Sequence, residues 1–225
     1  MPGRRAPEDE RREQILSAAY AVALRTGIAG VTLRAVAAEA GLSHGLLLFH
    51  FKRKEELVGA LLDRVLATTV MRGVADGVTS EDGAGSPPRA ADRLGAFLRH
   101  ELERISDEPR GTRLFFEYWA LGVHQAAIRK KIGAAMTRYR AAFRSMAEEI
   151  LAAEPSRGRG AAATNGLTPD ALAAVAVSLI NGCAVQMMID PDQFDTDAYL
   201  AAVQDLIARL VPSPTARRAP ARSRP

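Results

Sequence analysis

Residues 32–54 bring positively charged and apolar side chains together in a way that suits a nucleic acid. The cations of this stretch are Arg34, His44, His50, Lys52, Arg53 and Lys54. Basic side chains neutralise phosphate groups, and apolar side chains pack on the thymine methyl group in the major groove of DNA. The combination predicts a surface that holds the DNA backbone and contacts base edges.

Two short helices must position these side chains. Thr32 is a favourable N-cap for the first helix, Gly41 permits the left-handed conformation that ends it, and Ser43 is a favourable N-cap for the second. This helix-turn-helix pattern turns Leu47 and Phe51 toward the protein. The residues on the opposite face are Gly45, Leu46, Leu48 and Phe49. Because the outer face of a surface helix is normally polar, these residues either contact DNA or pack against the rest of the protein.

The sequence of residues 41–57, GLSHGLLLFHFKRKEEL, resembles the signature of TetR-type bacterial transcriptional regulators. The resemblance extends back through Thr32 to the first helix. It implies a repressor that binds double-stranded operator DNA as a homodimer and responds to an unknown small-molecule effector.

The resemblance also assigns DNA contacts by position. It places Thr32, Arg34, His50 and Lys54 near phosphates. It turns His44, Gly45, Leu46, Leu48 and Phe49 toward bases and backbone. Ser43 and Lys52 complete the candidate DNA-binding set. Leu46 stands where a small polar residue is common, Leu48 where tyrosine is common and Arg53 where a serine cap is common. The loss of hydroxyl groups at residues 46 and 48 shifts the expected specificity toward thymine methyl groups.

Composition indicates an ordinary globular protein. The small net charge does not by itself indicate a nucleic-acid partner, so that hypothesis depends on where the charged residues lie. Of the 225 residues, 48% are hydrophobic and 25% are charged, and the formal net charge is +4. Cys183 is the single cysteine, which fits a reducing cytosol and a small core residue. The N-terminal residues lack an apolar signal segment, and the apolar stretch 171–189 is interrupted by Ser178, Asn181 and Gln186. We therefore expect a cytoplasmic protein that does not associate with membranes.

Patterns typical of catalysis, metal binding and cofactor binding are missing from the sequence. His100 and His124 are far apart and lack metal-ligand spacing with any carboxylate. There is no Ser/His/Asp arrangement and no glycine loop that would hold a phosphate. We expect no enzymatic activity, no metal and no cofactor.

Helix caps and apolar periodicity predict an all-α fold of about nine helices. A three-helix DNA-binding head with a helix-turn-helix covers residues 11–53, and a helical ligand-binding and dimerisation domain covers residues 54–211. A disordered arm is expected at residues 1–10 and a disordered basic tail at residues 212–225. The first helix is expected over residues 10–26, with Gly27 as its stop, and the fourth over residues 54–73. Residues 76–89 and 154–168 are expected to be unstructured.

Aromatic residues concentrate at positions 115–119. Phe116, Trp119 and Ala120 share one helix face, which indicates either core packing or the lining of a ligand pocket. The candidate pocket residues are Phe116, Trp119, His124, Met136, Tyr139, Asn181 and Met187. Their mixture of aromatic and polar groups predicts a moderately apolar effector, and Glu117 leaves room for a cationic one.

The last two helices carry enough apolar surface to form a dimer interface. The candidate interface residues are Leu179, Met187, Leu200, Val203, Leu206 and Leu210. A four-helix bundle across a two-fold axis would bury them, whereas the alternative interpretation places all six in the core of one subunit.

Two other functions stay open. One is a DNA-binding regulator with the same head and no small-molecule input. The other is a helical enzyme or adaptor with a vestigial head, which the missing hydroxyl groups at Leu46 and Leu48 suggest.

Overall fold

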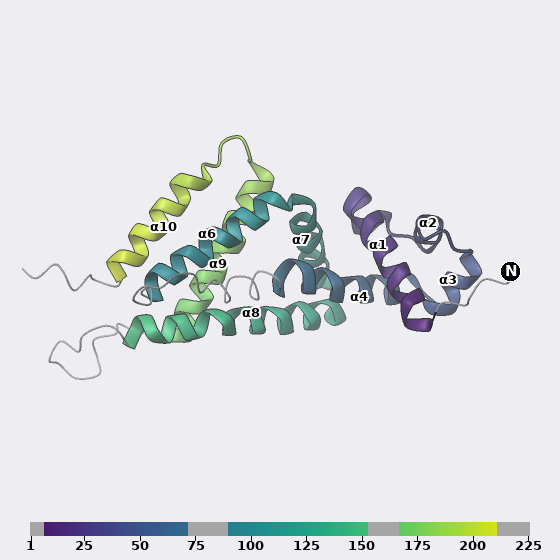
Figure 1. The fold of residues 1–225 in the computed structure, drawn as a ribbon, viewed down its shortest axis with the longest axis horizontal. Helices are drawn as coiled ribbons and strands as arrows, with labels where there is room; N and C mark the ends of the chain where they lie inside the picture. Colours follow the sequence, from purple (N-terminus) through teal and green to yellow (C-terminus); the bar gives the residue numbers. More distant parts are fainter. Residues whose placement is uncertain (1–6, 72–89, 153–166, 211–225) are drawn as a thin grey trace, which may run out of the picture. The chain divides into compact units, whose positions relative to one another are not determined.

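The computed structural model describes residues 7–71, 90–152 and 167–210, and the regular elements in these ranges are all helical (Figure 1). The elements are α1 (Glu8–Gly30), α2 (Leu33–Glu39), α3 (His44–His50), α4 (Lys54–Val65), η1 (Leu66–Met71), α6 (Ala90–Asp107), α7 (Pro109–His124), α8 (Ala126–Ala152), α9 (Pro169–Ile189) and α10 (Thr196–Leu210). The all-α fold is confirmed. The basic tail, most of the N-terminal arm and most of the two segments expected to be unstructured lie outside the described residues.

Most helices begin and end near the capping and stop residues identified in the sequence. Gly27 leaves the helical conformation with φ +70°, as expected of a stop signal, and one further turn then runs to Gly30. The start of α1 differs, because the helix begins at Glu8, inside the expected arm. The fourth helix also differs, because α4 ends at Val65 and continues as the π-helix η1. The Thr68 hydroxyl donates to the Arg64 carbonyl at 3.0 Å, and such bonding by a threonine loosens a helix at that turn.

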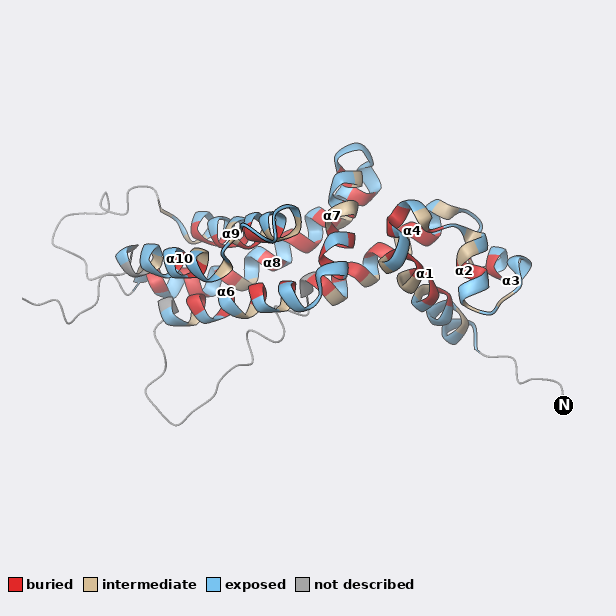
Figure 2. Cartoon of the chain, turned by 90° about the horizontal axis from the view of Figure 1, so that it is seen from above, coloured by how far each residue is buried: buried red, intermediate tan, exposed pale blue. Residues whose placement is uncertain are grey.

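Of the described residues, 7–71 and 104–139 form the first compact unit, in which α1 packs against α2, α4 and α7. The buried face of α1 includes Ile15, Ala19 and Val22, the stripe that its periodicity predicts. Figure 2 shows buried residues (red) on the inner faces of the helices. Arg25 of α1 donates to Glu39 of α2 at 2.6 Å, and this hydrogen bond lowers the pKa of the Glu39 carboxyl group. These contacts hold the small helices of the head together.

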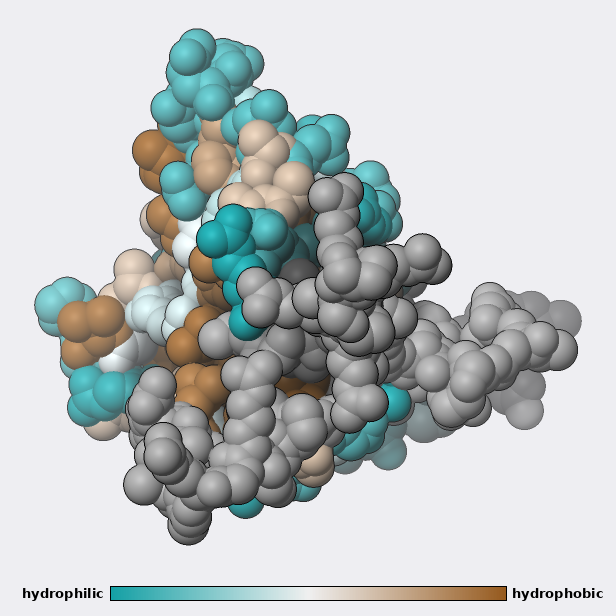
Figure 3. Space-filling model, turned by 90° about the vertical axis from the view of Figure 1, so that its left-hand side faces the viewer, coloured by the Kyte–Doolittle hydropathy of each residue, from teal (hydrophilic) through white to brown (hydrophobic). Residues whose placement is uncertain are grey.

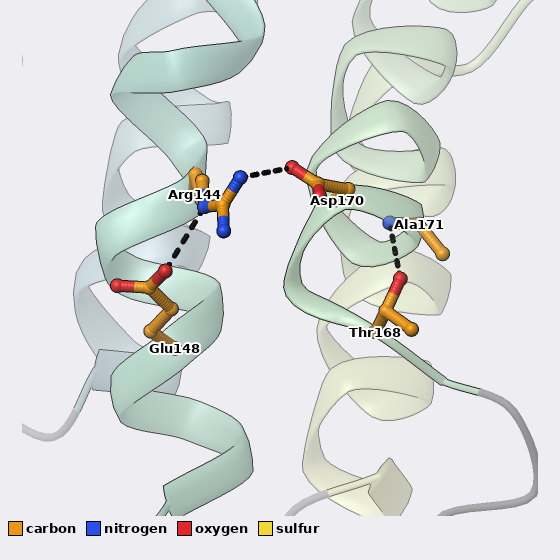
Figure 4. Close-up of polar contacts among 5 residues, drawn as sticks. All are labelled: Arg144, Glu148, Thr168, Asp170 and Ala171. Atoms are coloured by element: carbon orange, nitrogen blue, oxygen red, sulfur yellow. Dashed lines mark hydrogen bonds and ion pairs between the residues drawn. The ribbon is translucent and has the colours of Figure 1, made fainter.

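Of the described residues, 90–103, 140–152 and 167–210 form the second compact unit. Its α6 and α8 segments run antiparallel, because Arg93 pairs with Glu149 at 3.0 Å while Phe97 meets the Phe143 ring edge-on at 4.7 Å. Figure 4 shows how α8 joins α9. Arg144 donates to Asp170 of α9 at 2.8 Å and to Glu148 at 2.9 Å.

The start and the middle of α9 match the sequence analysis. Thr168 caps the helix by accepting a hydrogen bond from the Ala171 amide at 3.1 Å (Figure 4). Cys183 is fully buried, and burial raises the pKa of its thiol to about 11. The interpretation of Cys183 as a small core residue is confirmed. By length and composition alone, α9 could cross a membrane, a test that the core helix of a soluble protein also passes.

Candidate DNA-binding interface

The turn between α2 and α3 has the geometry that its sequence predicts. Gly41 adopts φ +64°, in the left-handed region that glycine favours. The Thr32 hydroxyl accepts a hydrogen bond from the Ala35 amide at 3.1 Å, and the Ser43 hydroxyl accepts one from the Leu46 amide at 3.2 Å. Both predicted N-caps are therefore present, and they fix the start of each helix of the motif.

The two faces of α3 are occupied as predicted. Leu47 is fully buried, and Phe51 beyond the helix end is buried beneath the Arg12 guanidinium, which lies 4.4 Å from its ring centroid. On the opposite face, Phe49 is 72% exposed and Leu46 and Leu48 are also exposed. From the sequence alone these three side chains could contact DNA or pack inside the chain, and the structure places them at the surface.

The outer face of α3 is open to a partner. A Cβ atom added at Gly45 would meet no heavy atom within 4 Å in the described part of the chain. The Phe49 ring lies edge-on to the His50 ring, with centroids 5.3 Å apart. The helix therefore presents a glycine, three apolar side chains and an imidazole on a short exposed surface, a composition that suits the major groove of DNA.

Basic residues flank the outer face of α3 in the sequence. Arg34, His44, Lys52 and Arg53 are exposed, and His50 and Lys54 are half-buried. The Lys54 ammonium donates to the Ala29 carbonyl at the end of α1, at 3.3 Å. Lys54 therefore joins the start of α4 to α1.

Glu56 organises the loop before α4, a role that sequence reasoning missed. Its carboxylate accepts a hydrogen bond from the Lys52 amide at 3.1 Å and one from the Arg53 guanidinium at 3.4 Å. The signal was present in the sequence, because a glutamate in the first turn of a helix often reaches back to the residues before it. Arg53 stands where a serine cap is common, and Glu56 supplies the loop contact in its place.

Helices α7 and α8 hold α4, the helix that follows the head, through polar contacts. The buried Tyr118 hydroxyl donates to the Val58 carbonyl at 2.8 Å, and its pKa is raised by burial and by the charges of Asp63 and Glu117. The Lys131 ammonium donates to the Gly59 carbonyl at 2.8 Å and to the Asp63 carboxylate at 2.6 Å. Sequence reasoning missed both anchors, because each joins residues at least 60 positions apart.

The candidate pocket residues lie in both compact units. Phe116, Trp119, His124, Met136 and Tyr139 belong to the first unit, and Asn181 and Met187 to the second. The buried face of α7 includes Leu114, Phe115 and Tyr118, rather than the face of Phe116, Trp119 and Ala120 that periodicity also allows. Trp119 is 37% exposed and stacks on Phe116 at 6.1 Å, while Met136 and Tyr139 are buried. His124 is exposed. The pocket stays a prediction.

The candidate dimer residues divide by burial. Leu200 and Val203 are buried in the core of the second unit, where the alternative interpretation placed them. Leu206 is 58% exposed, and Leu179 and Met187 are half-buried. The side chain of Leu210 lies outside the described set. The interface stays a prediction, with Leu206 as the exposed member of the original set.

Within the described ranges, no group of three or more His, Cys, Asp or Glu residues is placed to hold a metal ion.

Two family models match the chain. The model for bacterial regulatory proteins of the tetR family matches residues 15–61, and the model for the C-terminal part of BetI-type transcriptional repressors matches residues 88–212. The HTH-type transcriptional regulator BetI of Paraburkholderia phymatum is 26% identical over 205 residues, 89% of this chain and 93% of the relative. BetI of Stenotrophomonas maltophilia is 30% identical over 128 residues, 56% of this chain and 60% of the relative.

Solved structures show the same fold. A transcriptional regulator from Saccharomonospora viridis in complex with choline has a TM-score of 0.67 at 21% identity, with 89% of this chain and 96% of that chain covered. The regulator FadR of Bacillus subtilis in complex with stearoyl-CoA has a TM-score of 0.61 at 17% identity, with 89% and 98% covered.

Proposed function

Because the chain belongs to the tetR family of bacterial regulatory proteins, with a BetI-type C-terminal part, we propose that it is a cytoplasmic homodimeric repressor whose operator affinity is lowered by a small-molecule effector. The outer face of α3 carries the proposal. Leu46, Leu48 and Phe49 lie exposed beside the buried Leu47. Three exposed large apolar side chains on one short helix need a partner, and the arginine and lysine residues next to α3 in the sequence favour a polyanion.

The basic and the apolar side chains of this surface are expected to contact different parts of the DNA. Arg34, Lys52 and Lys54 neutralise phosphates and position the head, while Phe49, Leu46 and Leu48 contact base edges. Thymine presents a methyl group in the major groove, so the operator half-site is expected to contain thymine opposite these side chains.

The experiment is a gel-shift assay with the DNA that flanks the gene for this chain. The expected result is a discrete complex that survives an excess of random-sequence DNA of the same length. Equal competition by flanking and random DNA would contradict sequence-specific binding to that region. A chain that binds no DNA under these conditions would support the enzyme or adaptor alternative.

A dimer is needed because one small head offers too few contacts for tight binding, and two heads read half-sites one helical turn apart. The exposed face of α9 supplies the surface that we assign to the interface. Ile189 is 80% exposed, and Val175 and Val185 of the same helix are also exposed. Figure 3, which looks at the side where α10 lies in Figure 1, shows hydrophobic side chains (brown) at the surface. With Leu206 of α10, this face replaces Leu200 and Val203 in the proposed interface.

Sedimentation equilibrium at micromolar concentration tests the dimer. Ile189→Glu places a charge in the proposed interface and is expected to shift the chain toward monomer. Val123→Glu is the matched control, because Val123 is also exposed and apolar but lies in the other compact unit. A monomeric wild-type chain, or equal dissociation by both variants, would contradict the interface.

For the effector, we propose an organic cation as the first class to test. The Phe116 and Trp119 rings stack with an interplanar angle of 27°, Trp119 is accessible to solvent, and aromatic faces bind quaternary ammonium groups. The solved relative from Saccharomonospora viridis is in complex with choline. Choline is expected to release the chain from flanking DNA and to change the fluorescence of Trp119, the single tryptophan. Stearoyl-CoA serves as the competing candidate. If choline releases the Trp119→Ala variant from DNA with the same half-maximal concentration as the wild type, the cation binds elsewhere.

A further inference from the structure

Glu117 of α7 reaches the end of α1. Its Oε2 atom accepts a hydrogen bond from the Ile28 amide at 2.7 Å, across 89 positions of sequence. Gly27 is not helical, so Ile28 starts a new turn, and the first amides of a helical turn need acceptors from outside the helix. Glu117 supplies the missing acceptor. An anionic acceptor makes a stronger hydrogen bond with an amide than a neutral one does.

The contact requires glycine at position 27. A Cβ atom at Gly27 would lie 2.8 Å from Oε2 and 3.0 Å from Oε1 of Glu117. The φ angle of +70° also disfavours any side chain there. Gly27 therefore does two things: it ends the first part of α1, and it leaves room for the carboxylate of α7. Arg113, one turn earlier in α7, places its Nε atom 3.8 Å from Oε1 of Glu117.

The next residue of α7 holds α4, the helix that follows the head. The Tyr118 hydroxyl donates to the Val58 carbonyl of α4 at 2.8 Å. Adjacent residues of α7 thus bind the backbones of α1 and α4, the two helices on either side of the α2–α3 motif. Ile28 lies four positions before the Thr32 cap of α2, so a displacement at Ile28 passes directly into the motif.

We infer that Glu117 is a positioning residue for operator binding, which fixes the end of α1 against α7 so that α3 is held in the orientation that reads DNA. The inference rests on the proposed function and adds a residue that does not contact DNA. When Glu117 no longer holds Ile28, the head samples more orientations. The affinity for DNA then decreases in proportion to the fraction of molecules whose head is in the orientation that binds DNA.

The test compares Glu117→Ala, Glu117→Gln and the matched control Glu149→Ala in the full chain. Glu149 also loses a charged contact, its pair with Arg93 at 3.0 Å, but it lies in the other compact unit. The measurements are the dissociation constant for flanking DNA by fluorescence anisotropy, its dependence on salt, and the thermal midpoint of each variant. Anisotropy is read below the unfolding range of every variant.

Glu117→Ala is expected to weaken operator binding about tenfold, with an unchanged salt slope, because no phosphate contact is lost. Glu117→Gln keeps an oxygen that accepts from Ile28 and is expected to recover most of the affinity. Glu149→Ala is expected to bind as the wild type does, whatever its thermal midpoint. Gly27→Ala disturbs the same contact from the side of α1 and is expected to weaken operator binding as well.

Operator affinity within twofold of the wild type in a folded Glu117→Ala variant would overturn the inference. So would an equal loss in Glu149→Ala, tighter binding in Glu117→Ala, or a lower salt slope in that variant. A wild-type chain that does not bind flanking DNA specifically would instead count against the proposed function, so the two failures are distinguishable.

Discussion

Replacement of Phe49 by alanine separates DNA recognition from folding. Phe49 is 72% exposed, so folding buries little more than a quarter of its surface. Full burial of a phenylalanine contributes up to about 3 kcal/mol, so Phe49→Ala is expected to cost the fold less than about 1 kcal/mol. Leu47, two positions earlier, is fully buried, and Leu47→Ala is expected to cost about 2–5 kcal/mol.

The effect on DNA is expected to be larger than the effect on folding. A lost contact at one base pair costs about 1–3 kcal/mol, which is roughly a 5- to 150-fold change in affinity at each half-site. Binding to random DNA depends on the cations and is expected to change little. Phe49→Ala therefore lowers the ratio of specific to nonspecific affinity and leaves the salt slope unchanged.

The assay is fluorescence anisotropy with labelled flanking DNA and random DNA of equal length, together with urea unfolding of each variant. Val123→Ala is the matched control, because it also truncates an exposed apolar side chain in the same compact unit but outside the head. A contact between Phe49 and bases is refuted if Phe49→Ala weakens binding to both DNAs equally or leaves specificity unchanged. The surface position of Phe49 is refuted if its replacement lowers the free energy of unfolding as much as Leu47→Ala does.

Three further predictions address the cations, the head support and the core. Lys54→Ala is expected to weaken binding to specific and random DNA alike and to lower the salt slope by about one, and a change confined to flanking DNA would show that Lys54 contacts bases. Tyr118→Phe removes the buried hydrogen bond to Val58 and is expected to lower the free energy of unfolding by about 1 kcal/mol in urea, and an unchanged midpoint would show that the bond contributes nothing. Cys183, whose pKa is raised to about 11 by burial, is expected to react with a thiol reagent near neutral pH only as the chain unfolds, and rapid labelling of the folded chain would contradict its place in the core.

The sequence predicted the DNA-binding motif well because local rules determine it. The caps at Thr32 and Ser43, the left-handed Gly41 and the buried Leu47 each depend on residues within one or two turns. Helical periodicity alone is then sufficient to place Phe49 outside. The support of the head could not be predicted in the same way. The hydrogen bond from Ile28 to Glu117 joins residues 89 positions apart, and no local pattern marks a carboxylate that will meet a backbone amide so far away.

Helix α7 shows a second limit of periodicity. Both Phe115 with Tyr118 and Phe116 with Trp119 form apolar pairs at helical spacing, so the sequence offers two candidate inner faces. Tertiary packing chooses the first, and the Tyr118 hydroxyl finds its partner on α4. The same packing turns Glu117 toward α1, although the sequence had suggested that it could meet a cationic effector. Because this carboxylate is already bonded to the head, the Phe116 and Trp119 rings are the groups of this helix that we propose for a cationic effector.

Helix α9 is apolar around most of its circumference, and composition cannot assign its outer face. Such a composition is typical of a core helix, of a membrane-spanning helix and of a helix in a dimer interface. Burial separates the faces: Cys183 and Ile180 lie in the core, whereas Val175, Val185 and Ile189 remain exposed. Exposure of these valine and isoleucine side chains to water is unfavourable, and a second copy of the same helix can bury them across a two-fold axis. In the proposed dimer, the apolar outer face of α9 would join two copies so that both exposed α3 faces can contact one operator.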